Sequence, residues 1–356
     1  MLRQLRFAVV ALAASVSVTA AASAWSTQSA PASSCEFQTT ERVVAIGDVH
    51  GAFDQFVKIL QEAKLIDARR RWIGGRAVLV QVGDFHDRGA ETGKVIELMR
   101  KLEGEAARAG GKVHVLIGNH EAMRILGDYR YVSAGEYAAF RTATSEELRE
   151  RYLALLVDAN KKRTRAAGEE FDERAFSKKF LADTPLGFVE MQMAYAPQGD
   201  LGRWLRGLNA TITINGVVFM HGGPTLEVAS LGCAAINTRI RAELDTVRLT
   251  DPALSTSLIG GPDGPLWYRG LAEDESTLTA ADVDAVLKAL GARAIVIGHT
   301  VAPGFRIRAR FDGRVVQIDT GMLGGENYKG GVASALEVHG DAWTAIYTGR
   351  REPVQR

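Results

Sequence analysis

Five short polar segments interrupt this sequence, each at the end of a run rich in β-branched residues, and this placement restricts the possible folds most. Each segment delivers an Asp, Asn or His with a glycine beside it, so that the backbone can approach neighbouring atoms closely. Five such strand ends predict one shared metal site. The segments are residues 46–51, 82–89, 117–121, 220–223 and 297–300.

The order of elements around the first three segments predicts an α/β fold. Strand-like runs alternate with helical stretches, and the first helix repeats apolar residues at helical spacing. This alternation is typical of parallel strands, whose carboxyl ends gather at one edge of a sheet. Loops at that edge can converge on one ligand. The strands are expected at 42–46, 77–82 and 113–117, and the apolar helix residues are Phe53, Phe56, Val57 and Leu60.

The second half of the chain continues the pattern with a hairpin, a helix and further strands. Asn215-Gly216, between two strand-like runs, is typical of a tight β-hairpin turn. Thr279 and Asp282 predict the capped start of a helix that ends at Gly291. A strand is expected at 294–297, and four more, near 305–310, 315–318, 332–338 and 343–348, are expected to finish the chain as an antiparallel meander.

Residues 127–207 differ from the rest of the chain, because β-branched runs give way to charged, Ala-rich sequence. Thr144 with Glu147 has the spacing of a capping box, and the charge run 161–174 is typical of a solvated helix or loop. We interpret this region as a helical insertion that caps the site and shapes substrate access, since it contributes no metal-type motif.

The first residues have the features of a secretory signal peptide. Arg3 and Arg6 precede an apolar run at 7–18, and Ala22-Ser23-Ala24 is a small-residue cleavage signal. A membrane anchor is the alternative, but this run is short for a span and is interrupted by Ser and Thr. We therefore expect residues 1–24 to be removed on export to a bacterial periplasm or the medium, and residues 25–40 to form a linker.

Cysteine content and charge restrict the partners. Cys35 and Cys233 could form a disulfide in an exported protein, or could be two independent thiols. The formal net charge of +1 gives no reason to expect nucleic acid as a partner. No stretch after the signal peptide is apolar for long enough to cross a bilayer.

The polar segments supply the ligand types that water-activating cations prefer, namely carboxylate, amide oxygen and imidazole. Two such cations can clamp both ends of an in-line phosphoryl displacement, and one carboxylate must then bridge them, for which Asp84 is the natural candidate. Mn, Fe or Zn would suit ligation without thiolate. The candidate ligands are Asp48, His50, Asp84, Asn119, His221 and His299.

The same segments carry a clear resemblance to a known family. Gly47-Asp48-Val49-His50-Gly51, Gly83-Asp84 with Asp87-Arg88-Gly89, Gly118-Asn119-His120-Glu121, His221-Gly222-Gly223 and Gly298-His299 resemble the calcineurin-like metallophosphoesterases, specifically their phosphoprotein phosphatase branch. With its export signal and long helical insertion, the chain is most similar to the bacterial Shewanella-like protein phosphatases. The motifs span residues 42–321.

The resemblance implies an αββα sandwich over residues 41–350 that holds two metal ions. Asp48 and His50 would bind the first ion, Asp84 would bridge, and the second ion would be bound by Asn119, His221 and His299. It also implies that His120 protonates the leaving oxygen while Asp87 holds its imidazole. Arg88 would hold the phosphate oxygens, which suits its planar, charged fork. Arg269 is the candidate for a second phosphate-binding arginine.

Several residues stay outside these assignments. His86 either supports the site or touches substrate, or it is a surface histidine. Tyr328 lies in Glu326-Asn327-Tyr328-Lys329, without the rest of the family's C-terminal motif, and receives no role. Glu121 is expected to support the Asn-His loop rather than to touch substrate. His114 and His339 lie outside all motifs and are expected to be structural.

These features predict an exported, metal-dependent phosphoprotein phosphatase that hydrolyses phosphomonoesters by in-line attack of a metal-bridging hydroxide. The substrate would be phosphotyrosine, phosphoserine or phosphothreonine, or a small phosphoester. The alternative enzyme is a dinucleoside-polyphosphate or nucleotide phosphoanhydride hydrolase, since relatives with the same motifs cleave such bonds. A catalytically silent binding protein is disfavoured, because such a protein would have broken motifs and these are intact.

Overall fold

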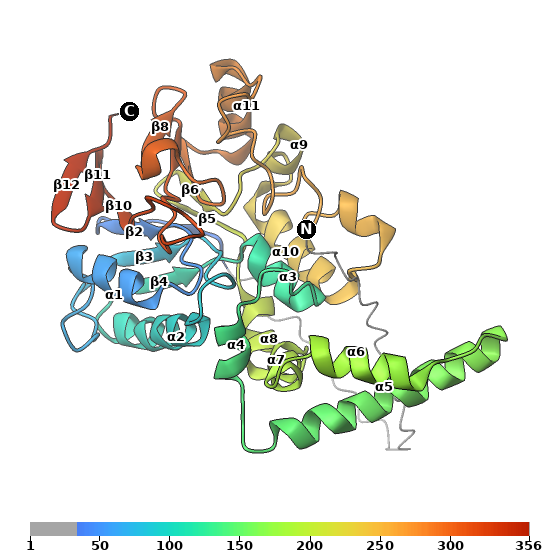
Figure 1. The fold of residues 1–356 in the computed structure, drawn as a ribbon. Helices are drawn as coiled ribbons and strands as arrows, with labels where there is room; N and C mark the ends of the chain where they lie inside the picture. The colour runs from blue at the N-terminus through green and yellow to red at the C-terminus, as the bar shows by residue number, and fades with distance from the viewer. Residues whose placement is uncertain (1–33, 356) are drawn as a thin grey trace, which may run out of the picture.

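Two β-sheets pack face to face, with helices on their outer sides (Figure 1). The structure is a computed structural model that describes residues 34–355. This arrangement confirms the predicted αββα fold. The predicted signal peptide 1–24, and the first part of the predicted linker, lie outside the described residues.

The first sheet contains the strands that lead to the first three polar segments. Its order is β12-β11-β10-β2-β3-β4. The strands β2 to β4 are parallel, and β10 to β12 run antiparallel to one another. Their bounds are β2 Val43–Ile46, β3 Val78–Gln81, β4 Lys112–Val115, β10 Ser334–His339, β11 Ala342–Tyr347 and β12 Arg350–Pro353.

The second sheet contains the strands that lead to the last two segments, in the order β1-β5-β6-β7-β9-β8. Here β6, β7 and β9 are parallel. The hairpin between β5 and β6 turns at Asn215 and Gly216, whose φ angles of 52° and 72° give the tight turn expected from the sequence. The bounds are β1 Glu36–Phe37, β5 Thr211–Ile214, β6 Val217–Met220, β7 Ala294–Ile297, β8 Arg308–Arg310 and β9 Val315–Gln317.

Alternation of side chains along the strands produces the layers. In β2, Val44 and Ile46 pack against the helices outside the first sheet, whereas Val43 and Ala45 pack in the core between the sheets. Successive strand residues point to opposite faces, so strands that are apolar at every position are buried on both sides. The outer helices are α1 Phe53–Glu62 and α2 Thr92–Arg108 on the first sheet, and α11 Ala280–Leu290 on the second.

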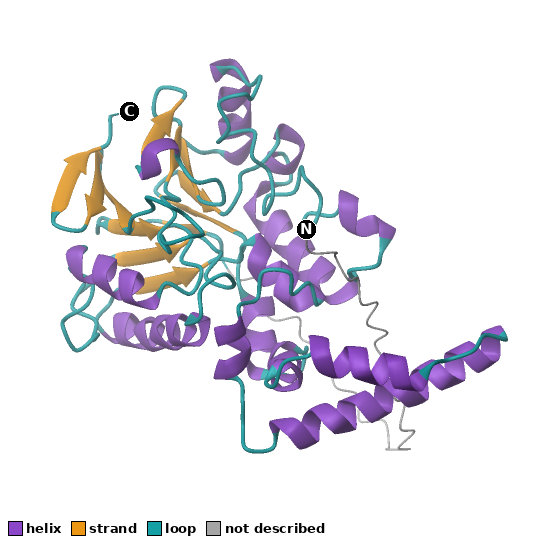
Figure 2. Ribbon diagram, viewed as in Figure 1, coloured by secondary structure: helices purple, strands orange, loops and turns teal. Residues whose placement is uncertain are grey.

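The predicted insertion is helical and lies to one side of the sheets (Figure 2). It follows α3 Asn119–Leu126, and its longest helix, α5, projects away from the body together with α6 (Figure 1). Later in the chain, the remaining helices are α9 Leu226–Ala229, α10 Gly232–Thr246 and two short 3₁₀ helices, Pro252–Thr256 and Pro303–Phe305. The insertion helices are α4 Ala134–Ala139, α5 Ser145–Ala167, α6 Glu173–Asp183, α7 Phe188–Tyr195 and α8 Asp200–Gly207.

The two helix starts proposed as capping boxes had different outcomes. At α11, Thr279 and Asp282 cap the helix reciprocally, and Gly291 ends it in a left-handed conformation, as predicted. At α5, the Thr144 side chain caps nothing and instead contacts the Thr142 hydroxyl. The neighbouring Ser145 hydroxyl bonds Glu190 of α7 and accepts the Thr142 backbone N–H, so the polar side chains here join the start of α5 to α7 rather than cap α5.

The predicted C-terminal meander is wrong as a single unit, because its strands belong to two sheets. Strand β9 pairs with β7 and β8 in the second sheet, whereas β10 and β11 pair in the first. A further strand, β12, extends the first sheet. Residue alternation identifies a strand but not the sheet that accepts it, and here the 318–333 segment crosses between the sheets.

The described part of the predicted linker is not free chain. Glu36 and Phe37 form the edge strand β1 beside β5, and Cys35 forms a disulfide with Cys233 at the start of α10. The Cα atoms of the two cysteines are 6.2 Å apart, within the range that a disulfide requires. Of the two alternatives left open by the sequence, the structure therefore contains the disulfide. None of the helices in residues 34–355 is long and apolar enough to cross a membrane.

Candidate metal centre

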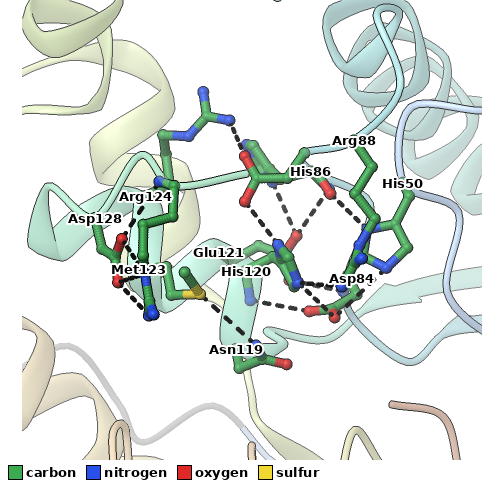
Figure 3. A network of polar contacts seen from close by, with 12 residues as sticks. His50, Asp84, His86, Arg88, Asn119, His120, Glu121, Met123, Arg124 and Asp128 are labelled. Carbon is green, nitrogen blue, oxygen red and sulfur yellow. Dashed lines mark hydrogen bonds and ion pairs between the residues drawn. The ribbon is translucent and has the colours of Figure 1, made fainter. Parts of the chain in front are cut away.

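The six predicted ligands are all buried and meet where the carboxyl ends of the parallel strands of both sheets face each other. The loops after β2 and β3 and the start of α3 come from the first sheet, and the loops after β6 and β7 come from the second. Figure 3 shows the His50 side chain beside Asp84, and Asn119 at the start of α3. The predicted ligands are Asp48, His50, Asp84, Asn119, His221 and His299.

Asp84 lies at the centre of this cluster. One carboxylate oxygen, Oδ1, accepts a hydrogen bond from the His120 backbone N–H at 3.0 Å. The other, Oδ2, lies 3.2 Å from His221 Nε2 and 3.9 Å from His50 Nε2. Asp84 also belongs to both groups of side chains whose ligand atoms lie within 4.8 Å of one another. A carboxylate shared by two adjacent cation sites would need this position.

The remaining predicted ligands adjoin these two histidines. Asp48 Oδ2 lies 3.9 Å from His50 Nε2, and Asn119 Oδ1 lies 2.9 Å from His221 Nε2. Asp48 is held in turn by the His299 backbone N–H, which donates to Oδ1 at 3.0 Å. Each half of the cluster therefore combines carboxylate or amide oxygen with imidazole.

Backbone carbonyls fix the orientation of the three ligand histidines. His50 Nδ1 lies 2.8 Å from the His86 carbonyl, His221 Nδ1 lies 3.1 Å from that of Val82, and His299 Nε2 lies 3.1 Å from that of Trp267. A carbonyl only accepts, so each of these nitrogens carries the hydrogen. The opposite nitrogen keeps its lone pair for a cation, which is the usual arrangement of metal-bound histidine.

The electrostatics of the cluster also fit cations. Burial lowers the pKa of His50 to about 3, and the neighbouring His120 contributes, so the ring is neutral. Burial likewise lowers the pKa of His299. Conversely, burial together with Asp319 and Asp84 raises the pKa of Asp48, because too little positive charge surrounds these carboxylates. Divalent cations would supply that charge, and the donors, oxygen and nitrogen without thiolate, suit them.

Backbone strain is concentrated in this region. Five of the eleven non-glycine residues with positive φ in the described chain belong to the polar segments, namely His50, Asp84, Asp87, Arg88 and His299. Such conformations persist only where the surrounding structure holds them, and they cluster at functional sites. The glycines are required for a related reason. A Cβ on Gly118 would lie 2.3 Å from Asp84 Oδ1, and one on Gly298 would lie 2.5 Å from Asp48 Oδ1.

His120 has a carboxylate on one side of its ring and a cation on the other. Its Nδ1 lies 2.7 Å from Asp87 Oδ2, and its Nε2 lies 3.3 Å from Arg88 Nη2. Burial opposes the charged ring, but Asp84 and Asp87 overcome this effect and raise the pKa of His120. His120 also lies near His50 and Asp84. However, the positive charge of the adjacent Arg88 guanidinium disfavours a metal ion at His120 Nε2. The position suits proton transfer better than metal ligation.

The two predicted arginines lie at different places in the site. The Arg88 guanidinium lies between the rings of Tyr131 and Tyr328, at 5.0 and 5.4 Å from their centroids. Its Nε is buried and has no hydrogen-bond partner among residues 34–355. Arg269 adjoins the ligand His299, because its Nη1 donates to the His299 carbonyl at 3.1 Å and to Thr300 Oγ1 at 2.8 Å.

Two residues that received no role from the sequence lie at the centre. Asp319 is buried beside Asp48, and burial raises its pKa to about 6. It follows β9 as Asp319-Thr320-Gly321, a sixth strand end of the same kind, and that signal could have identified it. The Tyr328 ring lies 5.9 Å from the His50 ring, with an interplanar angle of 20°. No local pattern predicts this contact, because the crossing segment between the sheets delivers it.

The surface interpretation of His86 is wrong, since this residue is completely buried. Its Nδ1 lies 2.9 Å from Glu121 Oε1 and its Nε2 lies 2.8 Å from the Tyr195 hydroxyl. Glu121 supports the loops, as predicted, by accepting the backbone N–H groups of Asp84 and Gly118. His114 packs against Phe37 and His339 is exposed at the end of β10.

With this geometry in place, comparison with known proteins assigns the class. The calcineurin-like phosphoesterase family model matches residues 41–303, so the chain belongs to that family. Its fold and metal-type side-chain clusters agree, and the protein is a metal-dependent phosphatase, as the sequence predicted.

Within this family, the relatives point to one branch. Shewanella-like protein phosphatase 2 of Arabidopsis thaliana is 30% identical over 321 residues, which cover 88% of this chain and 78% of the relative. Shewanella-like protein phosphatase 1 of Plasmodium berghei is 27% identical, over 81% and 68% of the two chains. The cold-active protein-tyrosine phosphatase of a psychrophilic Shewanella species superposes with a TM-score of 0.67 at 28% identity, over 90% and 82%. The chain is thus a member of the Shewanella-like protein phosphatases.

Proposed function

We propose that this protein removes phosphate from phosphotyrosine in proteins. The observation that carries the proposal is the position of Arg88 between two tyrosine rings, with a buried Nε donor that has no partner in the described part of the chain. A phosphate oxygen could accept a hydrogen bond from that N–H, and the planar guanidinium group matches the geometry of phosphate. Tyr131 is 42% exposed, so its ring is available to stack against an aromatic leaving group. The neighbouring Shewanella structure is that of a protein-tyrosine phosphatase.

The proposed ligand assignments share Asp84, which belongs to both groups of metal-type side chains. Asp48, His50 and Asp84 would hold one ion, and Asp84, Asn119, His221 and His299 would hold the other. Such a pair of ions, which we expect to be Mn, Fe or Zn, supplies an activated water nucleophile and neutralises charge on the phosphoryl group.

The protein's own side chains would complete the reaction. Arg88 binds and orients the phosphate, and Arg269 is proposed to assist from the His299 side of the site. His120 donates a proton from Nε2 to the leaving phenolic oxygen, while Asp87 stabilises the charged ring through Nδ1. The raised pKa of His120 favours the protonated ring that this step requires.

The test compares peptides after metal removal. The chain from residue 25 onward is purified, treated with a chelator and assayed for phosphate release from phosphotyrosine and phosphoserine peptides, before and after Mn²⁺ is restored. We expect release to stop with the chelator, to return with Mn²⁺ and to be faster from phosphotyrosine. Equal or faster release from phosphoserine would contradict the phosphotyrosine preference. Release only from diadenosine tetraphosphate would favour the alternative hydrolase.

We also propose that the protein is exported and acts in the periplasm or outside the cell. The signal-peptide features of residues 1–24 support this location. The disulfide between Cys35 and Cys233 supports it independently, since such bonds persist mainly in oxidising compartments. Fractionation of cells that produce the full chain would test the location, and accumulation in the cytoplasm would contradict it.

A further inference from the structure

A buried polar network joins the helical insertion to His120 and to Asp84. Part of this network is visible around Arg124, His86 and Glu121 in Figure 3. The insertion contributes Glu136 from α4 and Tyr195 from α7, which are 2% and 4% exposed. A cap that only restricts access would not need ionised or hydroxyl groups buried against the site. The network has two branches.

The first branch leads from the insertion to His120. Arg124, on α3, is only 1% exposed, and its Nη2 donates both to Asp87 Oδ1 and to Glu136 Oε1. The other oxygen of Asp87 holds His120 Nδ1 at 2.7 Å. One guanidinium is therefore shared between a carboxylate of the site and a carboxylate of the insertion.

Glu136 also reaches the loop itself. Its Oε1 accepts the Asp87 backbone N–H at 3.4 Å, and its Oε2 accepts that of Ser133 at 3.2 Å. Asp87 has a φ of 68°, a conformation that only its surroundings maintain. Glu136 thus accepts from the Asp87 backbone N–H and from Arg124, whose guanidinium also pairs with the Asp87 side chain.

The second branch leads from the insertion to Asp84. The Glu121 carboxylate accepts the backbone N–H groups of Asp84, Phe85 and Gly118, at 2.8, 3.0 and 2.7 Å. It also accepts from His86 Nδ1 at 2.9 Å, and since a carboxylate only accepts, this nitrogen carries the hydrogen. The other ring nitrogen, Nε2, lies 2.8 Å from the Tyr195 hydroxyl.

Tyr195 is the residue at which the branches meet. Its hydroxyl contacts His86, while its ring lies 5.1 Å from the Arg124 guanidinium carbon. Met191, one turn earlier in α7, contacts Arg124 Nη1 through its sulfur at 3.0 Å. Helix α7 therefore contacts Arg124, which supports the His120 side of the site, and His86, which supports the Asp84 side.

We infer that the helical insertion positions the reaction machinery, with Glu136 and Tyr195 as positioning residues for His120 and Asp84 respectively. This inference rests on the proposed function, because it assumes that His120 donates a proton and that Asp84 binds metal. Groups that orient metal ligands commonly affect metal affinity or activity by roughly 10- to 100-fold.

Glu136→Gln tests the first branch through the leaving group. A weakened Asp87–His120 pair impairs proton donation, which matters for phenyl phosphate but little for p-nitrophenyl phosphate, whose leaving group needs no proton. We expect kcat on phenyl phosphate to fall roughly 10-fold or more, with little change on p-nitrophenyl phosphate and an unchanged Mn²⁺ content. A general loss of structure would lower both rates equally.

Tyr195→Phe tests the second branch without reference to activity. The variant leaves His86 Nε2 without its hydrogen-bond partner, so we expect Mn²⁺ affinity, measured by equilibrium dialysis and metal analysis, to fall roughly 10-fold. Tyr129→Phe is the matched control, because it removes a hydroxyl that bonds Gln192 within the same insertion and does not contact His86. Thermal unfolding of both variants separates altered stability from altered affinity.

The outcomes are distinguishable. If Tyr195→Phe binds Mn²⁺ as tightly as Tyr129→Phe, and Glu136→Gln keeps the wild-type ratio of rates on the two esters, the insertion is only a cap and the inference is wrong. If the wild-type protein shows no chelator-sensitive phosphate release, the proposed function fails instead. The metal-affinity comparison at Tyr195 would still decide the second branch.

Discussion

The strand-end loops and the outer helices of the insertion use polar residues in opposite ways. In the loops, Asp48, His50 and Asp84 are at most 3% exposed and have fixed partners. In α5, by contrast, only Ser145, Val157 and Thr164 are buried, and its ion pairs lie on the surface. The pair of Arg151 and Glu147, for example, has side chains 73% and 57% exposed.

This difference predicts where substitutions matter. A buried polar group that loses its partner keeps its desolvation penalty, whereas an exposed ion pair exchanges its contact for water at little cost. The inner helices α4 and α7 behave like the loops, because Glu136 and Tyr195 are buried against the site. The effects of substitution should therefore decrease from the strand ends to the far end of α5.

The largest effect is expected at Asp84. Asp84→Asn removes the charge of the carboxylate that both ligand groups share, so metal loading and turnover should be lost together. Metal analysis of the purified variant, with phosphate release from a phosphotyrosine peptide, measures both. Asp312→Asn is the control, since that side chain is 88% exposed. Retention of two metal ions per chain in the Asp84 variant would show that this carboxylate is not shared.

A smaller effect is expected at His120. His120→Asn removes the proton donor but none of the six predicted ligands, so metal content should persist while turnover falls roughly 100-fold or more. The same two measurements apply, with His339→Asn as the control at an exposed strand end. If metal content falls as far as in the Asp84 variant, the role assigned to His120 is wrong.

The disulfide should affect stability rather than turnover. Cys35→Ser opens a link between residues 198 positions apart, and we expect the free energy of unfolding to fall by about 2–4 kcal/mol. The bond joins the β1 edge to α10, and neither element carries a predicted ligand, so kcat should stay unchanged. Denaturant unfolding of the single and double serine variants provides the measurement. A stability equal to that of the wild type would mean that the bond constrains nothing.

The smallest effect is expected in the outer insertion. Lys162 pairs with Asp158 one turn away on α5 at 2.7 Å, with side chains 75% and 61% exposed. Lys162→Ala should change the free energy of unfolding by less than about 0.5 kcal/mol, because surface pairs of this type contribute little. It should also leave kcat and KM unchanged. A large loss of activity would show that α5 contacts the substrate and would weaken the contrast between the two regions.

The sequence alone predicted the candidate site residues because their signals are local. A strand end, a glycine and a polar residue fit within five or six positions, and the five segments predicted the ligands that the structure brings together around Asp84. The same short-range patterns predicted the β5–β6 turn and the start of α11. The αββα fold itself came from the family resemblance of those segments.

Apart from Glu121, whose supporting role the sequence predicted, the partners of the supporting residues were decided by the tertiary structure, because those partners are distant in the sequence. His86 meets Tyr195 across 109 positions, and the Asp319 and Tyr328 contacts depend on a segment that crosses between the sheets. The choice of sheet for β8 to β11, and the contact of Ser145 with Glu190 at the start of α5, were likewise settled by packing. Local sequence patterns indicate the chemistry that a residue can perform, but the residues that it contacts depend on how the whole chain packs.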